Sequence, residues 1–207
     1  MPYPQNLHTA REVEAIVRAA GATPATVAII KGVPCVGVAA EQLEELARMG
    51  SRAVKTSRRD ISYVVSHQLH GATTVAATML LAARAGIRLF VTGGIGGVHR
   101  GGENTLDVSA DLTELGRTAM CVVCAGVKSI LDIPRTLEYL ETHGVTVASL
   151  GTDDFPAFFK AASGCKSPMR VDSPREVADM LLASDKLQLE NGMGRTFQLC
   201  DASKHMK

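Results

Sequence analysis

The residue best suited to chemistry in this sequence is a lysine, Lys128, that follows a predicted strand. The apolar run at 120–124 predicts a buried strand, and Ala125-Gly126-Val127 connects it to the lysine, which we predict to begin a helix. Because open α/β sheets bind ligands beyond the carboxyl ends of their strands, an amine at this place faces a ligand site. Partial burial and the positive end of a helix would both favour the neutral amine, which can attack a carbonyl carbon and form a Schiff base. A solvated surface lysine is the alternative interpretation.

A glycine-rich loop at 93–102 follows the short apolar strand predicted at 89–91. The Gly-x-Gly-x-x-Gly pattern of dinucleotide-binding folds would need glycine at position 99, where this sequence has His99. We therefore do not predict binding of NAD or FAD. Glycine at this density indicates backbone that closely approaches either a ligand or a neighbouring chain.

Acidic and hydroxyl side chains alternate at Asp107, Ser109 and Asp111, as they do in a calcium loop. Leu112 and Thr118 stand where an EF-hand needs glycine and glutamate, so an EF-hand is excluded. From the residues alone, Asp107 or Ser109 is predicted to cap a helix with an acidic first turn.

Two segments nearer the N-terminus carry groups that suit an anion. The turn after the strand predicted at 53–56 is basic through Lys55, Arg58 and Arg59, and from the residues alone a solvated connection is the favoured interpretation. The segment 71–75 leads into a helix, and the free backbone N–H groups at such a helix start can bind a phosphate group. An ordinary N-cap is the alternative there.

The succession of strands and helices predicts a three-layer α/β/α fold with a mainly parallel sheet covered on both faces. At 207 residues the chain is long enough for one well-packed domain. We predict one helix start at Thr9, where Thr9-Ala10-Arg11-Glu12 fits a capping box, and another at Ser173-Pro174. Cys121 and Cys124 lie three apart on a predicted strand and face opposite sides, so they are predicted to be core thiols.

Composition excludes several classes of function. The formal net charge is +1, which gives no electrostatic case for binding nucleic acid or an anionic membrane surface. The five cysteines are an odd set, and no signal peptide pattern is present at the N-terminus, so we expect a reduced cytoplasmic protein. No apolar run approaches the length of a membrane span.

Three segments closely resemble one enzyme family: GGIGGVHRG at 93–101, DVSADL at 107–112 and VVCAGVKSILD at 122–132. This is the family of pseudouridine-5'-phosphate glycosidases, also called indigoidine synthase A-like. The resemblance continues, in the same order along the chain, through MPYPQN at 1–6, VKTSRRD at 54–60, GATTVAAT at 71–78 and FPAFF at 155–159. It covers a partial family domain at residues 1–192, and residues 193–207 are interpreted as a divergent C-terminal tail.

The resemblance implies reversible cleavage of the C-glycosidic bond of pseudouridine 5'-phosphate to uracil and ribose 5-phosphate. It maps the family's Schiff-base lysine onto Lys128 and one water-mediated divalent metal, manganese (Mn²⁺), onto Asp107. The substrate-binding positions that it implies, with two further candidates for phosphate or base contacts at Thr92 and His99, are Lys55, Thr74, Val75, Ser109, Ala110 and Asp111. It also implies a homotrimer.

Family members carry a glutamate general acid in a segment that precedes the MPYPQN motif, and a further half-domain after residue 192. We therefore expect the chain to be truncated relative to the family, with Glu103 and Asp111 as candidates to replace the general acid. Two rival functions stay open. One is another Schiff-base lyase or aldolase acting on a sugar phosphate, which uracil dependence would separate. The other is an inactive or weakly active paralogue, which failure to form a lysine adduct would support.

Overall fold

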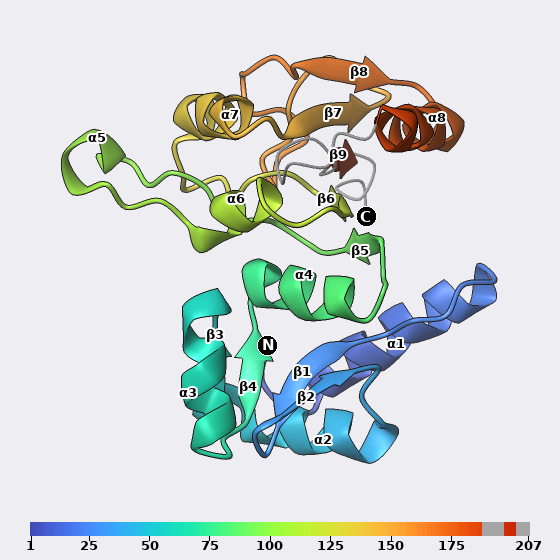
Figure 1. Ribbon diagram of the computed structural model, residues 1–207, viewed down its shortest axis with the longest axis vertical. Helices are drawn as coiled ribbons and strands as arrows, with labels where there is room; N and C mark the ends of the chain where they lie inside the picture. The colour runs from blue at the N-terminus through green and yellow to red at the C-terminus, as the bar shows by residue number, and fades with distance from the viewer. Residues whose placement is uncertain (188–196, 202–207) are drawn as a thin grey trace. The chain divides into compact units, whose positions relative to one another are not determined.

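The computed structural model describes residues 1–187 and 197–201 (Figure 1). The chain divides into two compact units, an N-terminal unit of residues 1–85 and a C-terminal unit of residues 86–207. Helices and strands alternate in both, which confirms the predicted α/β class. The strands form two sheets rather than one, a four-stranded sheet in the N-terminal unit and a five-stranded sheet in the C-terminal unit.

The N-terminal unit is built on a mixed sheet in the order β2-β1-β4-β3. The strands β1 and β2 are antiparallel, as are β1 and β4, whereas β3 and β4 are parallel. Ile29, Val64 and Leu81 form its buried core. In chain order the elements are α1 (Gln5–Ala19), β1 (Val27–Ile30), β2 (Val33–Val36), α2 (Ala40–Met49), η1 (Gly50–Arg52), β3 (Val54–Thr56), η2 (Arg58–Asp60), α3 (Ile61–Ser66), β4 (Gly71–Thr73) and α4 (Val75–Arg84).

The start of α1 differs from the prediction. The helix begins at Gln5, so Thr9 lies inside it, and the predicted capping box is wrong. The carbonyl oxygens of Pro2 and Pro4 already accept hydrogen bonds from the backbone N–H groups of Asn6 and His8, at 3.1 Å each. Proline suits such a place because a helix start does not need its missing N–H group. Further along, the side-chain amide of Asn6 donates to the carbonyl of Ala47 in α2, at 2.9 Å.

The C-terminal unit is built on a fully parallel sheet in the order β5-β6-β9-β7-β8. Its elements are β5 (Leu89–Val91), α5 (Gly102–Thr105), α6 (Ala110–Leu115), β6 (Cys121–Cys124), α7 (Ile133–Thr142), β7 (Thr146–Leu150), β8 (Met169–Val171), α8 (Pro174–Lys186) and β9 (Phe197–Asp201). Most of the stretch interpreted as a divergent tail, 193–207, lies outside the described residues; only the backbone of β9 is described there.

Helices cover both faces of this parallel sheet. The chain passes from β5 through β6 to β7 in one direction across the sheet, and the connection from β8 through α8 to β9 runs back. Right-handed connections then place α8 on the face opposite α6 and α7. In α8, Val177 packs against Cys121, Ala148 and Val171 of the sheet. The predicted three-layer arrangement is thus found within this unit.

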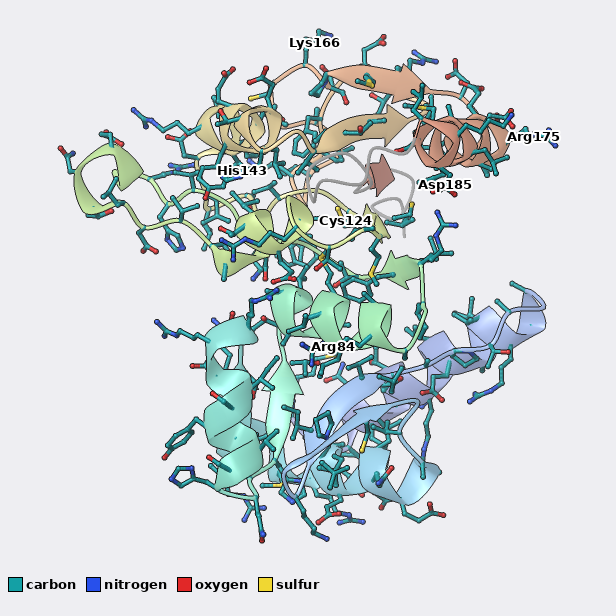
Figure 2. All side chains as sticks on the ribbon, in the orientation of Figure 1. Arg84, Cys124, His143, Lys166, Arg175 and Asp185 are labelled. Carbon is teal, nitrogen blue, oxygen red and sulfur yellow. The ribbon has the colours of Figure 1, made fainter. Side chains whose placement is uncertain are left out.

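Polar contacts fasten α8 to the edge of the sheet. Its Asp185, labelled in Figure 2, accepts hydrogen bonds on both carboxylate oxygens from Arg88 beside β5, at 2.9 and 2.8 Å. The helix begins as predicted, because the Ser173 hydroxyl accepts the backbone N–H of Glu176. None of the helices in the described part of the chain is both long and apolar enough to cross a lipid bilayer.

Candidate active site

The glycine-rich loop runs alongside the segment that carries Lys128. Strand pairing between β5 and β6 continues beyond both strands: Ala125 donates its backbone N–H to Gly93, and Ile95 donates to Gly126, at 2.9 and 3.1 Å. Lys128 then donates its own backbone N–H to Ile95, at 3.2 Å. These bonds hold the loop and the lysine segment in one register at the carboxyl edge of the parallel sheet, where the sequence predicted a ligand site.

Two glycines show why this edge tolerates no side chain at those positions. A Cβ atom on Gly96 would lie 2.1 Å from the hydroxyl oxygen of Ser109, and one on Gly126 would lie 2.0 Å from the carbonyl oxygen of Pro156. Gly126 also has a φ angle of +94°, in the left-handed region. The close approach predicted for the glycine-rich loop is, at Gly96, an approach to Ser109 of the same unit, and Gly126 approaches Pro156 in the same way.

The acidic segment contacts the same loop. The Ser109 hydroxyl accepts the backbone N–H of Asp111 at 3.2 Å, which confirms Ser109 as the N-cap of α6. The Asp111 side chain is buried, and its carboxylate accepts the backbone N–H of Gly96 at 3.0 Å. Asp111 and Lys128 are thus tied to adjacent residues of the glycine-rich loop, and Ala110 begins the helix between the cap and this carboxylate.

Lys128 itself differs from the prediction in two respects. The side chain is exposed, and no helix begins at it. The next helix, α7, begins at Ile133, because the Asp132 carboxylate accepts the backbone N–H of Arg135 at 3.1 Å and Pro134 occupies the first turn. The ammonium group makes no ion pair or hydrogen bond within the part of the chain that the structure describes, so it is open to an incoming carbonyl compound.

Predicted phosphate-binding residues lie together in the N-terminal unit. Lys55 is exposed on β3, and the parallel pairing of β3 with β4 places it beside Ala72, two residues before Thr74. Thr74 is the N-cap of α4, but its hydroxyl makes no capping bond; that oxygen is buried without a hydrogen-bond partner among the described residues. A cation, an unpartnered hydroxyl and the first N–H groups of a helix, starting with Val75, suit a phosphate group.

The predicted site residues therefore form two groups. Lys55, Thr74 and Val75 belong to the N-terminal unit. The group in the C-terminal unit consists of Thr92, His99, Asp107, Ser109, Ala110, Asp111 and Lys128. Thr92 follows β5 and donates its backbone N–H to Val123 of β6, at 2.9 Å. Two residues were suggested as replacements for a general acid. The Asp111 carboxylate accepts the Gly96 N–H, and Glu103 forms an ion pair with Arg135 at 3.0 Å.

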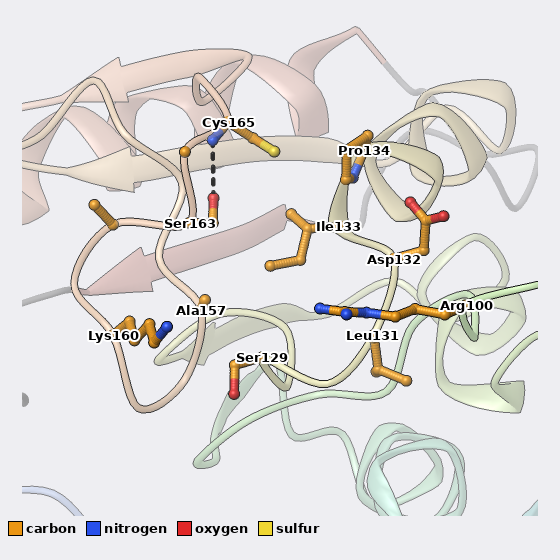
Figure 3. A pocket seen from close by; sticks show the side chains of 12 residues that line it. Arg100, Ser129, Leu131, Asp132, Ile133, Pro134, Ala157, Lys160, Ser163 and Cys165 are labelled. Carbon is orange, nitrogen blue, oxygen red and sulfur yellow. Dashed lines mark hydrogen bonds between the residues drawn. The ribbon is translucent and has the colours of Figure 1, made fainter.

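A pocket of about 440 Å³ adjoins the lysine segment (Figure 3). Ser129, the neighbour of Lys128, lines it together with Asp132, Arg100 and Lys160. Sequence reasoning did not single these residues out, although Arg100 lies in the GGVHRG run and Lys160 directly follows FPAFF. The backbone N–H of Arg135 and its guanidinium group, with a smaller contribution from Arg100, hold the pKa of Asp132 below its usual range.

The surroundings of Asp107 show whether this part of the structure suits the predicted metal. Within residues 1–187, no three His, Cys, Asp or Glu side chains come close enough together to hold an ion. Asp107 is exposed, and its carboxylate lies 3.7 Å from Nδ1 of His99. A hard divalent cation keeps several of its waters and needs only one or two carboxylates, so Asp107 fits water-mediated binding.

The two strand cysteines are core thiols, as predicted. Cys121 and Cys124 are both buried, and neither forms a disulfide with a residue of the described part of the chain. Burial raises the pKa of the Cys121 thiol to about 11, so it stays protonated at neutral pH.

Comparison with known proteins agrees with the resemblance in the sequence. The chain is 58% identical over 193 residues to a pseudouridine-5'-phosphate glycosidase of Arabidopsis thaliana, covering 93% of this chain and 58% of that protein. It is 57% identical over 192 residues to the Solibacter usitatus protein of the same name, covering 93% of this chain and 64% of that one. The chain thus spans about three fifths of the length of these relatives.

Two solved structures share the fold. An indigoidine synthase A-like protein from Thermotoga maritima superposes with a TM-score of 0.87 at 36% identity, covering 97% of this chain and 65% of that one. The prealnumycin C-glycosynthase AlnA, solved in complex with ribulose 5-phosphate, superposes with a TM-score of 0.83 at 39% identity, covering 96% and 64%. The family model described as "Indigoidine synthase A like protein" matches residues 1–202, and the chain belongs to that family.

Proposed function

We propose that this chain carries the catalytic lysine of a pseudouridine-5'-phosphate glycosidase, which reversibly cleaves pseudouridine 5'-phosphate to uracil and ribose 5-phosphate. The observation that supports this most directly is the Lys128 segment. Backbone hydrogen bonds hold this segment against the glycine-rich loop, and the exposed Lys128 amine has no ion-pair partner in the described part of the chain. The chain is more than half identical to two enzymes of that name.

The reaction needs an amine because the bond to be broken joins two carbon atoms. Protonating a leaving oxygen, as ordinary glycosidases do, does not by itself cleave such a bond. In the proposed sequence the ribose ring opens as O4' leaves C1' and takes a proton, and the Lys128 amine adds to C1'. The nitrogen lone pair then forms a C1'=N bond while the electrons of the C1'–C5 bond pass to uracil C5, which takes a proton. Water hydrolyses the resulting iminium ion, which returns the lysine and ribose 5-phosphate.

The other predicted residues would bind and orient the substrate. Lys55, Thr74 and Val75 offer a cation, a hydroxyl and helix N–H groups to the 5'-phosphate. Asp111 would keep the glycine-rich loop in place through Gly96. Thr92, His99, Ser109 and Ala110 are proposed to contact the substrate. Asp107 would hold a divalent cation, which we propose to be Mn²⁺, through water, and such an ion would neutralise phosphate charge.

Borohydride trapping tests the nucleophile. The protein is incubated with ribose 5-phosphate and Mn²⁺, reduced, digested and mapped by mass spectrometry. We expect a reduced sugar-phosphate adduct on Lys128 that disappears in Lys128→Ala and persists in Lys166→Gln, a control at an exposed lysine of the same unit. An adduct scattered over several surface lysines, or none at all, would refute the assignment and favour the inactive paralogue.

A second candidate is another Schiff-base lyase or aldolase acting on a sugar phosphate. One observation gives it weight: a solved relative with the same fold was crystallised with ribulose 5-phosphate, a sugar phosphate without a base. The two candidates differ in their dependence on uracil. In the synthetic direction, the proposed glycosidase consumes ribose 5-phosphate only when uracil is added, whereas an aldolase is indifferent to uracil.

We further propose that the protein is cytoplasmic and assembles as a homotrimer. Among the side chains that the structure describes, Cys35, Cys121, Cys124 and Cys165 form no disulfide with one another, which supports a reducing compartment. The trimer rests on the resemblance to the family. Sedimentation equilibrium tests it: a trimer has three times the chain mass of 21.9 kDa, and a single species of one chain mass would contradict it.

A further inference from the structure

The pocket beside the lysine segment has a chemical character of its own. It lies wholly in the C-terminal unit and is formed by the end of the glycine-rich loop, the segment 129–134 and the segment 157–165. Arg100 enters from the first of these segments and Lys160 from the third. Figure 3 shows their side chains extending into the pocket from opposite sides, toward one another.

Neither side chain makes an ion pair or a hydrogen bond in the described part of the chain, whereas the neighbouring Lys166 pairs with Asp154 at 3.2 Å. Arg100 attracts the Asp132 carboxylate only weakly, as the smallest of the influences that lower the pKa of that group. Asp132 is the one acidic residue among those that line the pocket. Its carboxylate is engaged by Arg135, through the backbone N–H at 3.1 Å and the guanidinium at 2.6 Å.

Two like charges that point into one cavity repel each other, and an anion between them removes this cost. We propose that this pocket binds a phosphate group between Arg100 and Lys160. Its volume of about 440 Å³ lies within the range of small-ligand pockets and exceeds what phosphate alone occupies.

This site is built from residues of the C-terminal unit, whereas the Lys55, Thr74 and Val75 group, to which the resemblance assigns the substrate phosphate, belongs to the N-terminal unit. The phosphate in the pocket has two possible sources, the phosphate of ribose 5-phosphate or free inorganic phosphate. Both present the same oxygens to an arginine and a lysine. The proposal concerns binding alone and does not require that the chain cleaves pseudouridine 5'-phosphate.

Isothermal titration of the whole chain with inorganic phosphate and with ribose 5-phosphate tests the proposal. We expect Arg100→Gln and Lys160→Gln each to weaken binding about tenfold or more, since each removes a charge-assisted contact. Lys166→Gln, at the outer surface in Figure 2, should bind as the wild type does. Lys55→Gln, titrated in parallel, should still show the phosphate binding that the Arg100 and Lys160 variants lose. Arg100 and Lys160 are exposed, so these variants should keep the fold.

Trapping at a subsaturating concentration of ribose 5-phosphate separates the two sources. If the pocket binds the reacting sugar phosphate, the pocket variants reduce the yield of the Lys128 adduct. If it binds free phosphate, they lose phosphate binding while the adduct yield stays the same. The proposal is overturned if the wild type binds neither compound, or if both pocket variants bind them as tightly as the wild type. Failure of the proposed function would instead show as a wild type that forms no Lys128 adduct, whatever the titrations give.

Discussion

Gly126 lies two residues after the end of β6, in the backbone that connects this strand to Lys128. Its φ angle of +94° is unfavourable for any residue with a side chain, and a Cβ would lie 2.0 Å from the carbonyl oxygen of Pro156. Gly126→Ala therefore has two costs. An alanine is strained in the left-handed backbone conformation, and its Cβ clashes with the backbone of Pro156, which must shift to make room. We expect a loss of roughly 3–5 kcal/mol in the free energy of unfolding, measured by urea denaturation.

The matched control for this prediction is Gly151→Ala. Gly151 also has a left-handed φ angle, +68°, but no heavy atom lies within 4 Å of its added Cβ. That variant should lose only about 1–2 kcal/mol. Equal losses for the two substitutions would show that the contact with Pro156 contributes nothing.

Thr136 joins three segments of the candidate site through one buried hydroxyl. It accepts the backbone N–H of Val98 in the glycine-rich loop at 2.9 Å and donates to the carbonyl of Asp132 at 2.6 Å. Thr136→Val keeps the shape of the side chain but leaves the Val98 N–H buried without an acceptor, which costs about 1–3 kcal/mol. The Asp132 carbonyl keeps its bond from the backbone N–H of residue 136.

Hydrogen exchange measures this effect at the bond itself. We expect the Val98 amide to exchange faster in Thr136→Val and at the wild-type rate in Thr136→Ser, which restores the hydroxyl. If Val98 exchanges equally in both variants, the hydroxyl does not hold the loop.

At this scale the sequence could indicate which residue types matter but not what surrounds them. Lys128 was placed correctly after its strand because apolar runs and glycine are local signals. The helix predicted to begin at Lys128 was wrong, although Asp132 and Pro134 carry the same kind of cap and proline signal that marked the start of α8 at Ser173. Arg100 and Lys160 escaped notice because they are sixty positions apart in the sequence and meet only in the folded pocket.

Helix starts provide a test at the scale of elements. Of the starts predicted at Thr9 and at Ser173-Pro174, the structure contains only the second. Ser173 caps α8: its hydroxyl accepts the Glu176 N–H at 3.3 Å and donates to the Glu176 carboxylate at 3.0 Å. Ser173→Ala should lower the free energy of unfolding by about 1 kcal/mol. Thr9→Ala should leave it unchanged or raise it by a few tenths, because Thr9 lies inside α1, where alanine is the better helix former.

Urea denaturation of the two variants, followed by circular dichroism, distinguishes these expectations. A Thr9→Ala variant that lost as much stability as Ser173→Ala would restore the capping box that the sequence suggested. The error at α1 has a physical origin: a Thr-x-x-Glu pattern fits the inside of a helix as well as its start. The proline carbonyls that begin this helix four residues earlier form no comparable sequence signal.

For the whole molecule, the sequence predicted the class of the fold but not the division into two sheets. Apolar runs of three to five residues mark strands, and those strands were found at close to the predicted places. Which strands pair depends on contacts between segments far apart in the chain, such as those of β9 with β6 and with β7, and local patterns do not encode these contacts. Chain length, likewise, suggested one domain where the structure forms two compact units.

Burial of a titratable group in the parallel sheet predicts how the stability of the folded chain changes with pH. The thiol of Cys121 has a pKa of about 11 in the folded protein, against 9.0 when it is fully solvated, because burial disfavours the thiolate. Below pH 9 the thiol is protonated in both states and its contribution to stability is complete. Above pH 9 the unfolded chain loses this proton first, so the free energy of unfolding falls until the pH passes about 11.

A difference of about two pKa units corresponds to a loss of up to roughly 3 kcal/mol across this range. Lysine and tyrosine side chains also titrate there, so the comparison must be with a variant that differs at this thiol alone. We expect Cys121→Ala to be less stable than the wild type at pH 8 and to lose less stability between pH 8 and pH 11, so that the two profiles converge. Cys35→Ala removes a half-exposed thiol of the other unit and serves as the matched control. Parallel profiles for wild type and Cys121→Ala would mean that the thiol ionises as readily in the folded chain as in the unfolded one, and that the sheet around it admits water.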